Sequence, residues 1–160
     1  MVTINIIAVG KVKEKYFINA INEYNQRLSA FCKLNIIEIK DESIPQNAND
    51  SQIAEVLTKE ANAILAKLPK DSYIFALCVE GKQFSSEELA KEIGKIQVNG
   101  ESSLTFIIGG SVGLANEIKS RANVKLSFSK MTFPHQLFRV MLTEQIYRAF
   151  KILNHHTYHK

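Results

Sequence analysis

Residues 104–120 read LTFIIGGSVGLANEIKS, and they show the pattern on which the rest of the chain is built. The run 104–108 is apolar and β-branched, which is typical of a buried strand. Two glycines follow, and the segment near 114–120 has the character of a short helix. A strand, a glycine turn and a helix in this order make one unit of a parallel α/β sheet.

The same alternation extends from this unit toward both ends of the chain. Further strands are expected at 3–9, 34–39, 73–79 and 124–128, and a first helix at 14–30. A second helix should begin at a cap formed by Asp50 or Ser51, and a third at a capping box of Ser85 and Glu88. The last helix should run from Pro134, as its first residue, to about 153. We therefore predict one α/β domain over residues 1–160, with a mostly parallel sheet flanked by helices. Ligands bind such sheets at the carboxyl ends of the strands, so the loops after Val79, Ile108 and Phe128 are the places where we expect a site.

The composition is that of an ordinary globular protein, with 46% hydrophobic and 22% charged residues in 160. No apolar run is long enough to span a membrane, and no signal peptide precedes the first strand, so we expect no membrane association. The two cysteines, Cys32 and Cys78, form neither a disulfide framework nor a metal pattern. We therefore expect both cysteines to be packing residues, in a protein of the reducing cytoplasm.

The positive charge is unevenly distributed along the chain. Residues 111–160 contain 8 Lys and Arg but only 2 Asp and Glu, together with all four histidines, whereas residues 1–110 are slightly acidic. Such asymmetry is typical of a surface that faces a polyanion, although charge alone leaves open a basic face with no partner.

The last helix is apolar around nearly its whole circumference. A helix of this kind is buried on more than one side. For a terminal helix of a small domain, the simplest second cover is another subunit, so we expect a homodimer; a fully interior helix is the alternative. Arg139 has no acidic residue one turn away on the helix, so we expect its guanidinium to be available to bind a phosphate.

Residues 109–113, GGSVG, match the G-x-S-x-G pattern of a nucleophile elbow. Hydrolase chemistry would need an acid and then a histidine downstream, but after Ser111 the only acids are Glu117 and Glu144, and neither is suitably placed. The dinucleotide and phosphate-loop patterns fail as well. Adjacent glycines still allow a ligand to approach the backbone closely, or they make a plain turn. His155, His156 and His159 have no neighbouring carboxylate or cysteine, and we expect no metal.

Several longer stretches together resemble the ribosomal RNA large subunit methyltransferase H family of SPOUT enzymes. They are 6–13 (IIAVGKVK), 107–113 (IIGGSVG), 126–135 (LSFSKMTFPH), 139–149 (RVMLTEQIYRA) and 158–160 (YHK). The likeness spans the whole chain in order, and the run 126–148 is its most specific part. Two positions depart from the family pattern: Cys78 stands where relatives often carry an acid, and Val112 where they are often polar.

The resemblance implies a SPOUT fold whose C-terminal segment forms a trefoil knot, and a homodimer. It implies methyl transfer from S-adenosylmethionine to N3 of a pseudouridine in helix 69 of the large-subunit ribosomal RNA. The expected partner is this RNA within the ribosome. The cofactor-binding residues that it implies are Leu77, Gly109, Phe128, Ser129, Lys130, Met131, Thr132 and Phe133.

The catalytic residues that follow from the resemblance and from their clustering in the basic segment are His135, Arg139, Tyr158 and His159. We expect His159 or Tyr158, from the tail of one subunit, to lie beside the acceptor base and take its proton. His135 and Arg139 would shape the site. Two other readings remain open at this point: a SPOUT enzyme that acts on transfer RNA, and a ribosome-binding protein without catalysis.

Overall fold

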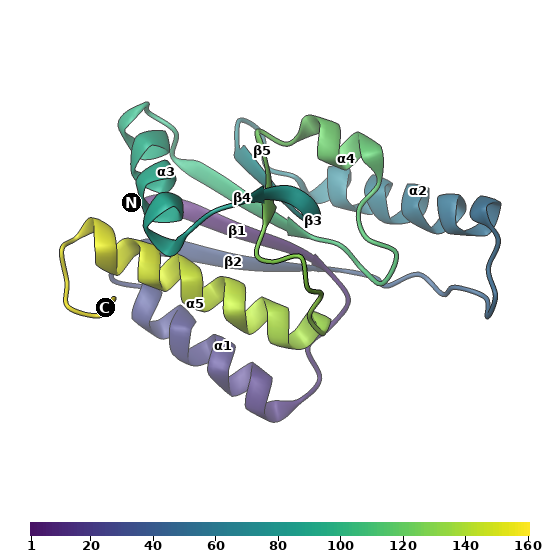
Figure 1. The fold of residues 1–160 in the computed structure, drawn as a ribbon, viewed down its shortest axis with the longest axis horizontal. Helices are drawn as coiled ribbons and strands as arrows, with labels where there is room; N and C mark the ends of the chain where they lie inside the picture. Colours follow the sequence, from purple (N-terminus) through teal and green to yellow (C-terminus); the bar gives the residue numbers. More distant parts are fainter.

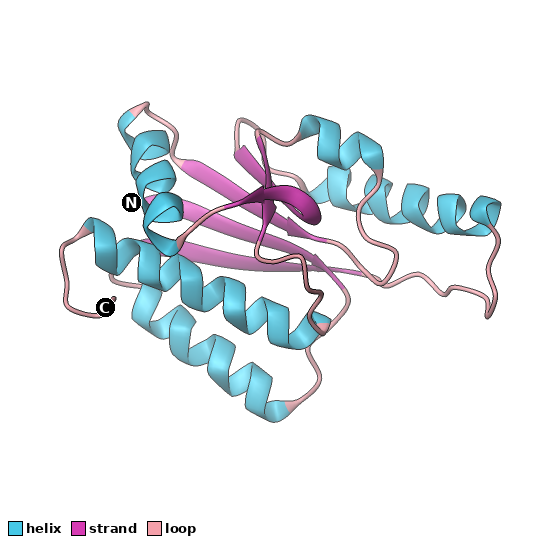
Figure 2. Ribbon diagram, viewed as in Figure 1, coloured by secondary structure: helices cyan, strands magenta, loops and turns pink.

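The computed structural model describes all of residues 1–160, in which five strands alternate with five helices (Figures 1 and 2). The strands are β1 (Val2–Val9), β2 (Cys32–Ile39), β3 (Tyr73–Gln83), β4 (Ser103–Ile108) and β5 (Val124–Ser127). The helices are α1 (Lys15–Leu28), α2 (Asp50–Lys67), α3 (Ser86–Val98), α4 (Asn116–Arg121) and α5 (His135–Leu153). The predicted α/β fold is therefore confirmed, and its sheet is wholly parallel.

The strands lie in the order β2-β1-β4-β3-β5. Because all of them run in the same direction, their carboxyl ends meet at one edge of the sheet, where α/β proteins bind ligands. The trefoil knot that the family resemblance implies is not tested by this strand order and stays a prediction.

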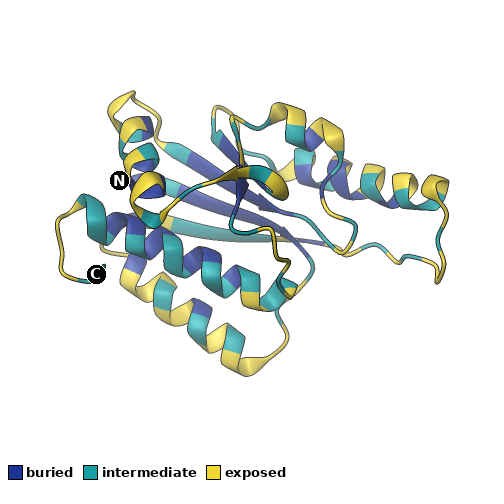
Figure 3. Cartoon of the chain, in the orientation of Figure 1, coloured by how far each residue is buried: buried dark blue, intermediate teal, exposed yellow.

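Helices cover both faces of the sheet, which explains why its strands are apolar without interruption. Along β1, Ile4 and Ile6 belong to a core shared with α3 and α5, and Ile7 and Val9 to a second core under α2 and α4. Figure 3 shows the buried residues concentrated along the strands between these layers. In the larger core, the completely buried rings of Phe75 and Phe106 stack with centroids 4.6 Å apart.

Strand β3 is longer than the expected 73–79 and bends around its neighbour β5. Leu126 of β5 pairs first with Leu77 and, after a bulge in β3, again with Lys82. The bend requires glycine at position 81, because a Cβ there would lie 2.7 Å from the backbone of Lys125. In Figure 1, the end of β3 curls over β5, so the segment leaving β5 starts from a fixed place at the carboxyl edge.

The helix ends differ from the sequence predictions at two places. The side chain of Asn49, rather than Asp50 or Ser51, caps α2 and forms a reciprocal capping box with Gln52. Pro134 is the residue before α5 rather than its first helical residue. The capping box predicted at the start of α3 is confirmed.

Helix α5 is buried on the side that faces the sheet, where Leu142 and Ile146 are inaccessible. Its other side keeps partly exposed apolar residues, and Leu137 is 37% exposed. A second subunit could cover this side, and the homodimer stays a prediction. No helix is long and apolar enough to cross a membrane.

Candidate active site

A cavity of about 1100 Å³ opens at the carboxyl edge of the sheet. The loops that follow β1, β2, β4 and β5 contribute to its wall, together with residues 77–80 of β3 and the first turn of α5. The predicted loops after Ile108 and Phe128 are parts of this wall, whereas the segment after Val79 reaches the wall as a continuation of β3 and is not a loop. The loops after β1 and β2 were missed, although parallel strands bring every such loop to the same edge.

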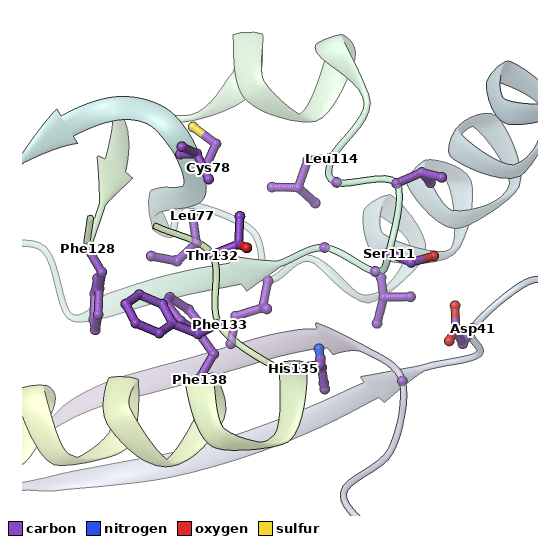
Figure 4. Close-up of a pocket in the computed structure, with 18 of the residues that line it drawn as sticks. Asp41, Leu77, Cys78, Ser111, Leu114, Phe128, Thr132, Phe133, His135 and Phe138 are labelled. Atoms are coloured by element: carbon purple, nitrogen blue, oxygen red, sulfur yellow. The ribbon is translucent and has the colours of Figure 1, made fainter. Parts of the chain in front are cut away.

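Most of the predicted cofactor-binding residues line this cavity. They are Leu77, Gly109, Phe128, Ser129, Met131, Thr132 and Phe133. Lys130 does not line it and is exposed to solvent. In the view of Figure 4, the rings of Phe128, Phe133 and Phe138 lie at one end of the pocket, Ser111 and Asp41 lie at the other, and His135 lies between them.

The glycine turn after β4 is closed tightly on itself. The amide of Gly113 donates a hydrogen bond to the carbonyl of Gly110 at 3.0 Å. A Cβ on Gly109 would lie 2.5 Å from the carbonyl oxygen of Gly113, so no side chain fits there without moving backbone. The turn thus presents bare backbone to the cavity. It does not act as a nucleophile elbow, because no histidine and acid pair contacts Ser111.

The segment after β5 makes the apolar end of the cavity and is fixed by its own serines. Ser127 donates a hydrogen bond to the carbonyl of Ser129 at 3.0 Å, and the amide of Met131 donates to the hydroxyl of Ser129 at 3.0 Å. The ring of Phe138 on α5 packs against Phe128 with centroids 4.8 Å apart. These contacts shape the loop before any ligand is present.

Arg139 is buried beneath the cavity wall and is only 2% exposed. Its guanidinium forms an ion pair with Glu38 of β2 at 2.6 Å and donates hydrogen bonds to the carbonyl of Gly10 at 3.1 Å and to Nε2 of His135 at 2.8 Å. The expectation that Arg139 is free to meet a phosphate is therefore wrong. Its partner Glu38 is 101 residues away in sequence, beyond the reach of a one-turn pairing rule.

The contact with Arg139 fixes the protonation of His135. A guanidinium only donates, so Nε2 of His135 must accept, and the proton of the neutral ring lies on Nδ1. Nδ1 is buried and has no hydrogen-bond partner. Burial lowers the pKa of His135 below its ordinary value, and the positive charge of Arg139 lowers it further. His135 therefore presents an uncharged imidazole to the cavity.

We expect two substitutions to move the pKa of His135 in opposite directions. Arg139→Gln removes a positive charge and should raise this pKa, whereas Glu38→Gln removes a negative charge that raises it and should lower it further. Titration of the histidine Cε1 protons by NMR measures both shifts, with His135→Gln used for assignment. Unchanged values in both variants would contradict the proposed electrostatic link.

The same pKa shift makes stability depend on pH. Because the folded state disfavours the imidazolium, the unfolded chain binds a proton to this residue more readily. The free energy of unfolding should thus fall as the pH is lowered through the ordinary histidine pKa of about 6.5. The contribution of His135 is lost in the His135→Gln variant.

The tail residues Tyr158 and His159 lie outside this cavity. His159 contacts Glu87 of α3 at 2.6 Å and Arg148 of α5 at 3.0 Å. Tyr158 donates a hydrogen bond to Glu144 at 3.1 Å. Burial and the charge of Glu144 raise the pKa of Tyr158 to about 12, so its phenol stays protonated at neutral pH. Within one chain, the structure does not bring the tail together with His135.

A second hollow, of about 510 Å³, lies between the cavity and the tail. Phe128 and Phe133 line both hollows, and Glu144, the partner of Tyr158, lines the second. The two hollows thus share a wall made by these two rings, and the second hollow reaches the face of α5 that carries Glu144.

Comparison with known proteins places the chain in a family. Residues 2–159 match the family model described as "Predicted SPOUT methyltransferase". Proteins named "Ribosomal RNA large subunit methyltransferase H" from Clostridium botulinum, strains Alaska E43 and Hall, are 55% and 54% identical over 157 residues, which is 98% of this chain and 99% of theirs. A methylase family protein of known structure from Haemophilus influenzae matches with a TM-score of 0.53 at 13% identity, over 98% of this chain and 70% of that one, and supports the fold. The chain belongs to the SPOUT methyltransferases, within the ribosomal RNA large subunit methyltransferase H group.

Proposed function

We propose that this protein transfers a methyl group from S-adenosylmethionine to large-subunit ribosomal RNA, at N3 of a pseudouridine in helix 69. The observation that carries the proposal is the cavity in which the glycine turn after β4 meets the loop after β5. Support comes from the relatives named ribosomal RNA large subunit methyltransferase H and from the basic C-terminal third of the chain.

The residues present fit the cofactor. An adenine needs an apolar slot and backbone hydrogen bonds, and the loop 128–133 with Leu77 offers both beside the bare backbone of Gly109. The sulfonium of the cofactor supplies an already activated methyl group. What remains for the protein is to align the acceptor and to remove the N3 proton.

Among the proposed catalytic residues, the two on α5 have positioning roles. Arg139 fixes His135 and joins it to the loop after β1 through the carbonyl of Gly10. The neutral His135 can donate one hydrogen bond from Nδ1, but it is poorly suited to carry a positive charge. We infer that these two residues shape the cavity and leave proton removal to another group.

For proton removal we propose the tail. Because the phenol of Tyr158 stays protonated at neutral pH, it serves as a hydrogen-bond donor. The imidazole of His159 is the group that accepts the proton, at Nδ1, once this nitrogen has exchanged its contact with Arg148 for the acceptor base. In a homodimer covering the exposed side of α5, the tail of one subunit would lie beside the acceptor base. The hollow between the cavity and Glu144 supports this arrangement, since it leads from the cofactor loop to the tail.

The proposal is tested by transfer of a tritiated methyl group from labelled S-adenosylmethionine. The substrates are ribosomes, free large-subunit RNA and bulk transfer RNA, all from cells that lack the modification. We expect label in the large-subunit RNA alone, and digestion to nucleosides should place it on the base of a pseudouridine. Label in transfer RNA alone would overturn the substrate, and binding to ribosomes without label would indicate a protein that lacks catalysis.

A further inference from the structure

The loop between β1 and α1 is fixed along its backbone at the rim of the cavity. Oε1 of Gln136, in the first turn of α5, accepts hydrogen bonds from the amides of Lys13 and Glu14 at 2.9 Å and 3.1 Å. The amide of Val12 donates a hydrogen bond to Glu38 of β2 at 3.3 Å. Figure 1 shows this loop passing the start of α5 on its way to α1. The loop thus has a defined position before any ligand binds.

The lysine side chains of this loop, in contrast, have no partner. Lys11 and Lys13 are exposed and form no ion pair, although both line the cavity. Lys40, from the loop after β2, also lines the cavity and is likewise exposed and unpaired. Charged groups on a backbone that is already ordered bind a partner at a lower entropic cost than groups on a mobile loop.

The rim of the cavity carries an excess of positive charge. Four lysines and three acids line the cavity. Two of these acids are neutralised, because Glu38 pairs with Arg139 and Glu80 pairs with Lys119. Three lysines and Asp41 remain, which is a surplus of two positive charges. Such a surplus at a concave site attracts an anionic partner, and lysine binds phosphate as a point charge.

An exposed aromatic ring follows the lysines. Tyr16 lies in the first turn of α1, three residues after Lys13, and is 65% exposed. Lysines beside an exposed ring are typical of proteins that bind unpaired nucleic acid, because the cations hold phosphates and the ring stacks on a base. A free phosphate or the carboxylate of a small ligand would satisfy the lysines but would leave the ring without a partner.

We propose that the loop between β1 and α1 docks an unpaired RNA strand next to the acceptor nucleotide. Lys11, Lys13 and Lys40 bind its phosphates, and Tyr16 stacks on one of its bases. The inference rests on the proposed RNA substrate and assigns a docking surface at the rim of the cavity, apart from the aromatic loop 128–133. It concerns the slightly acidic part of the chain, where the overall charge gives no sign of RNA binding.

Filter binding to ribosomes that lack the modification, at several salt concentrations, tests the lysines. The site variant is Lys11→Gln with Lys13→Gln. The matched control is Lys67→Gln with Lys70→Gln, two exposed and unpaired lysines that precede β3 and therefore lie at the opposite edge of the sheet. We expect the site variant to bind ribosomes tenfold more weakly or worse at about 0.1 M salt, and the control to bind as the wild type does.

The salt dependence gives a second readout. The slope of log affinity against log salt concentration should be smaller by about 1.4 in the site variant, because each phosphate contact to a single strand contributes about 0.7. Tyr16→Ala should weaken binding about fivefold or more without changing this slope, whereas Tyr16→Phe keeps the ring and should bind normally. Circular dichroism melting and gel filtration check the fold and the oligomeric state of each variant.

The outcomes separate this inference from the proposed function. Equal losses in the site variant and the control would show general charge attraction only and would overturn the docking surface. So would calorimetry in which the site variant loses affinity for S-adenosylhomocysteine, since the lysines would then serve the cofactor. Normal binding by Tyr16→Ala, or a loss that accompanies a changed oligomeric state, would overturn the stacking role. A wild type that binds ribosomes with the expected dependences but transfers no methyl group would support the surface and overturn the enzymatic proposal.

Discussion

Replacing Gly109 with alanine should greatly weaken cofactor binding and lower the rate of methyl transfer by roughly 100-fold or more, since displacements near 1 Å in a positioned site reduce reaction rates by this much. The reason is steric: the new Cβ would lie 2.5 Å from the carbonyl oxygen of Gly113 and 2.6 Å from its carbonyl carbon. Backbone cannot yield as the end of a flexible side chain can. The turn must open, and its wall of the cavity must move with it.

The comparison variant is Gly94→Ala in α3. A Cβ there would approach only Cδ2 of Leu153, which can rotate away, and alanine favours the helix. Calorimetry with S-adenosylhomocysteine should therefore show normal affinity for Gly94→Ala and greatly reduced affinity for Gly109→Ala. Both variants are first checked for a cooperative thermal transition. A folded Gly109→Ala protein with normal affinity would refute the role assigned to this turn.

Removal of residues 157–160 should lower the rate of methyl transfer by about 100-fold to 10,000-fold, the usual range for loss of a general base. Cofactor affinity should stay unchanged, because neither Tyr158 nor His159 lines the cavity. The ring of Tyr158 packs against Tyr147 of α5 with centroids 4.9 Å apart, so circular dichroism melting first checks that the truncated protein is folded.

Single substitutions distinguish the two tail residues. His159→Gln should remove most of the rate. Tyr158→Phe should lower the rate less, because a phenol with a pKa of about 12 stays protonated and acts as a donor, not as the base. Single-turnover assays on ribosomes measure both effects. Full turnover by the truncated protein would exclude any catalytic role of the tail.

The fold was predictable because each strand and each long helix has a recognisable local sequence pattern. Each strand is a short apolar run bounded by polar residues or glycine, and each long helix has apolar positions at helical spacing. The errors lie at element ends. Strand β3 continues four residues beyond Val79 because pairing with β5 stabilises a polar continuation, which no local pattern reveals.

Seven of the eight cofactor-binding residues that the family resemblance implies line the cavity, but the contacts between distant segments could not be predicted from the sequence. Arg139 looked unpaired because its acid, Glu38, comes from another element. Asp41 lies in a polar stretch that resembles any loop. Such residues become visible only when the strands bring their loops to one edge.

The bend of β3 around β5 has a consequence for the order in which the protein becomes functional during synthesis. Strand β5, the loop 128–133 and α5 leave the ribosome after the other four strands, yet they complete the sheet edge, one wall of the cavity and the cover of the larger core. A nascent chain that stops before residue 124 has four strands but lacks the aromatic wall of the cavity. Ligand binding should thus report that translation has reached the C-terminal helix, because domains fold as units once their distant segments are available.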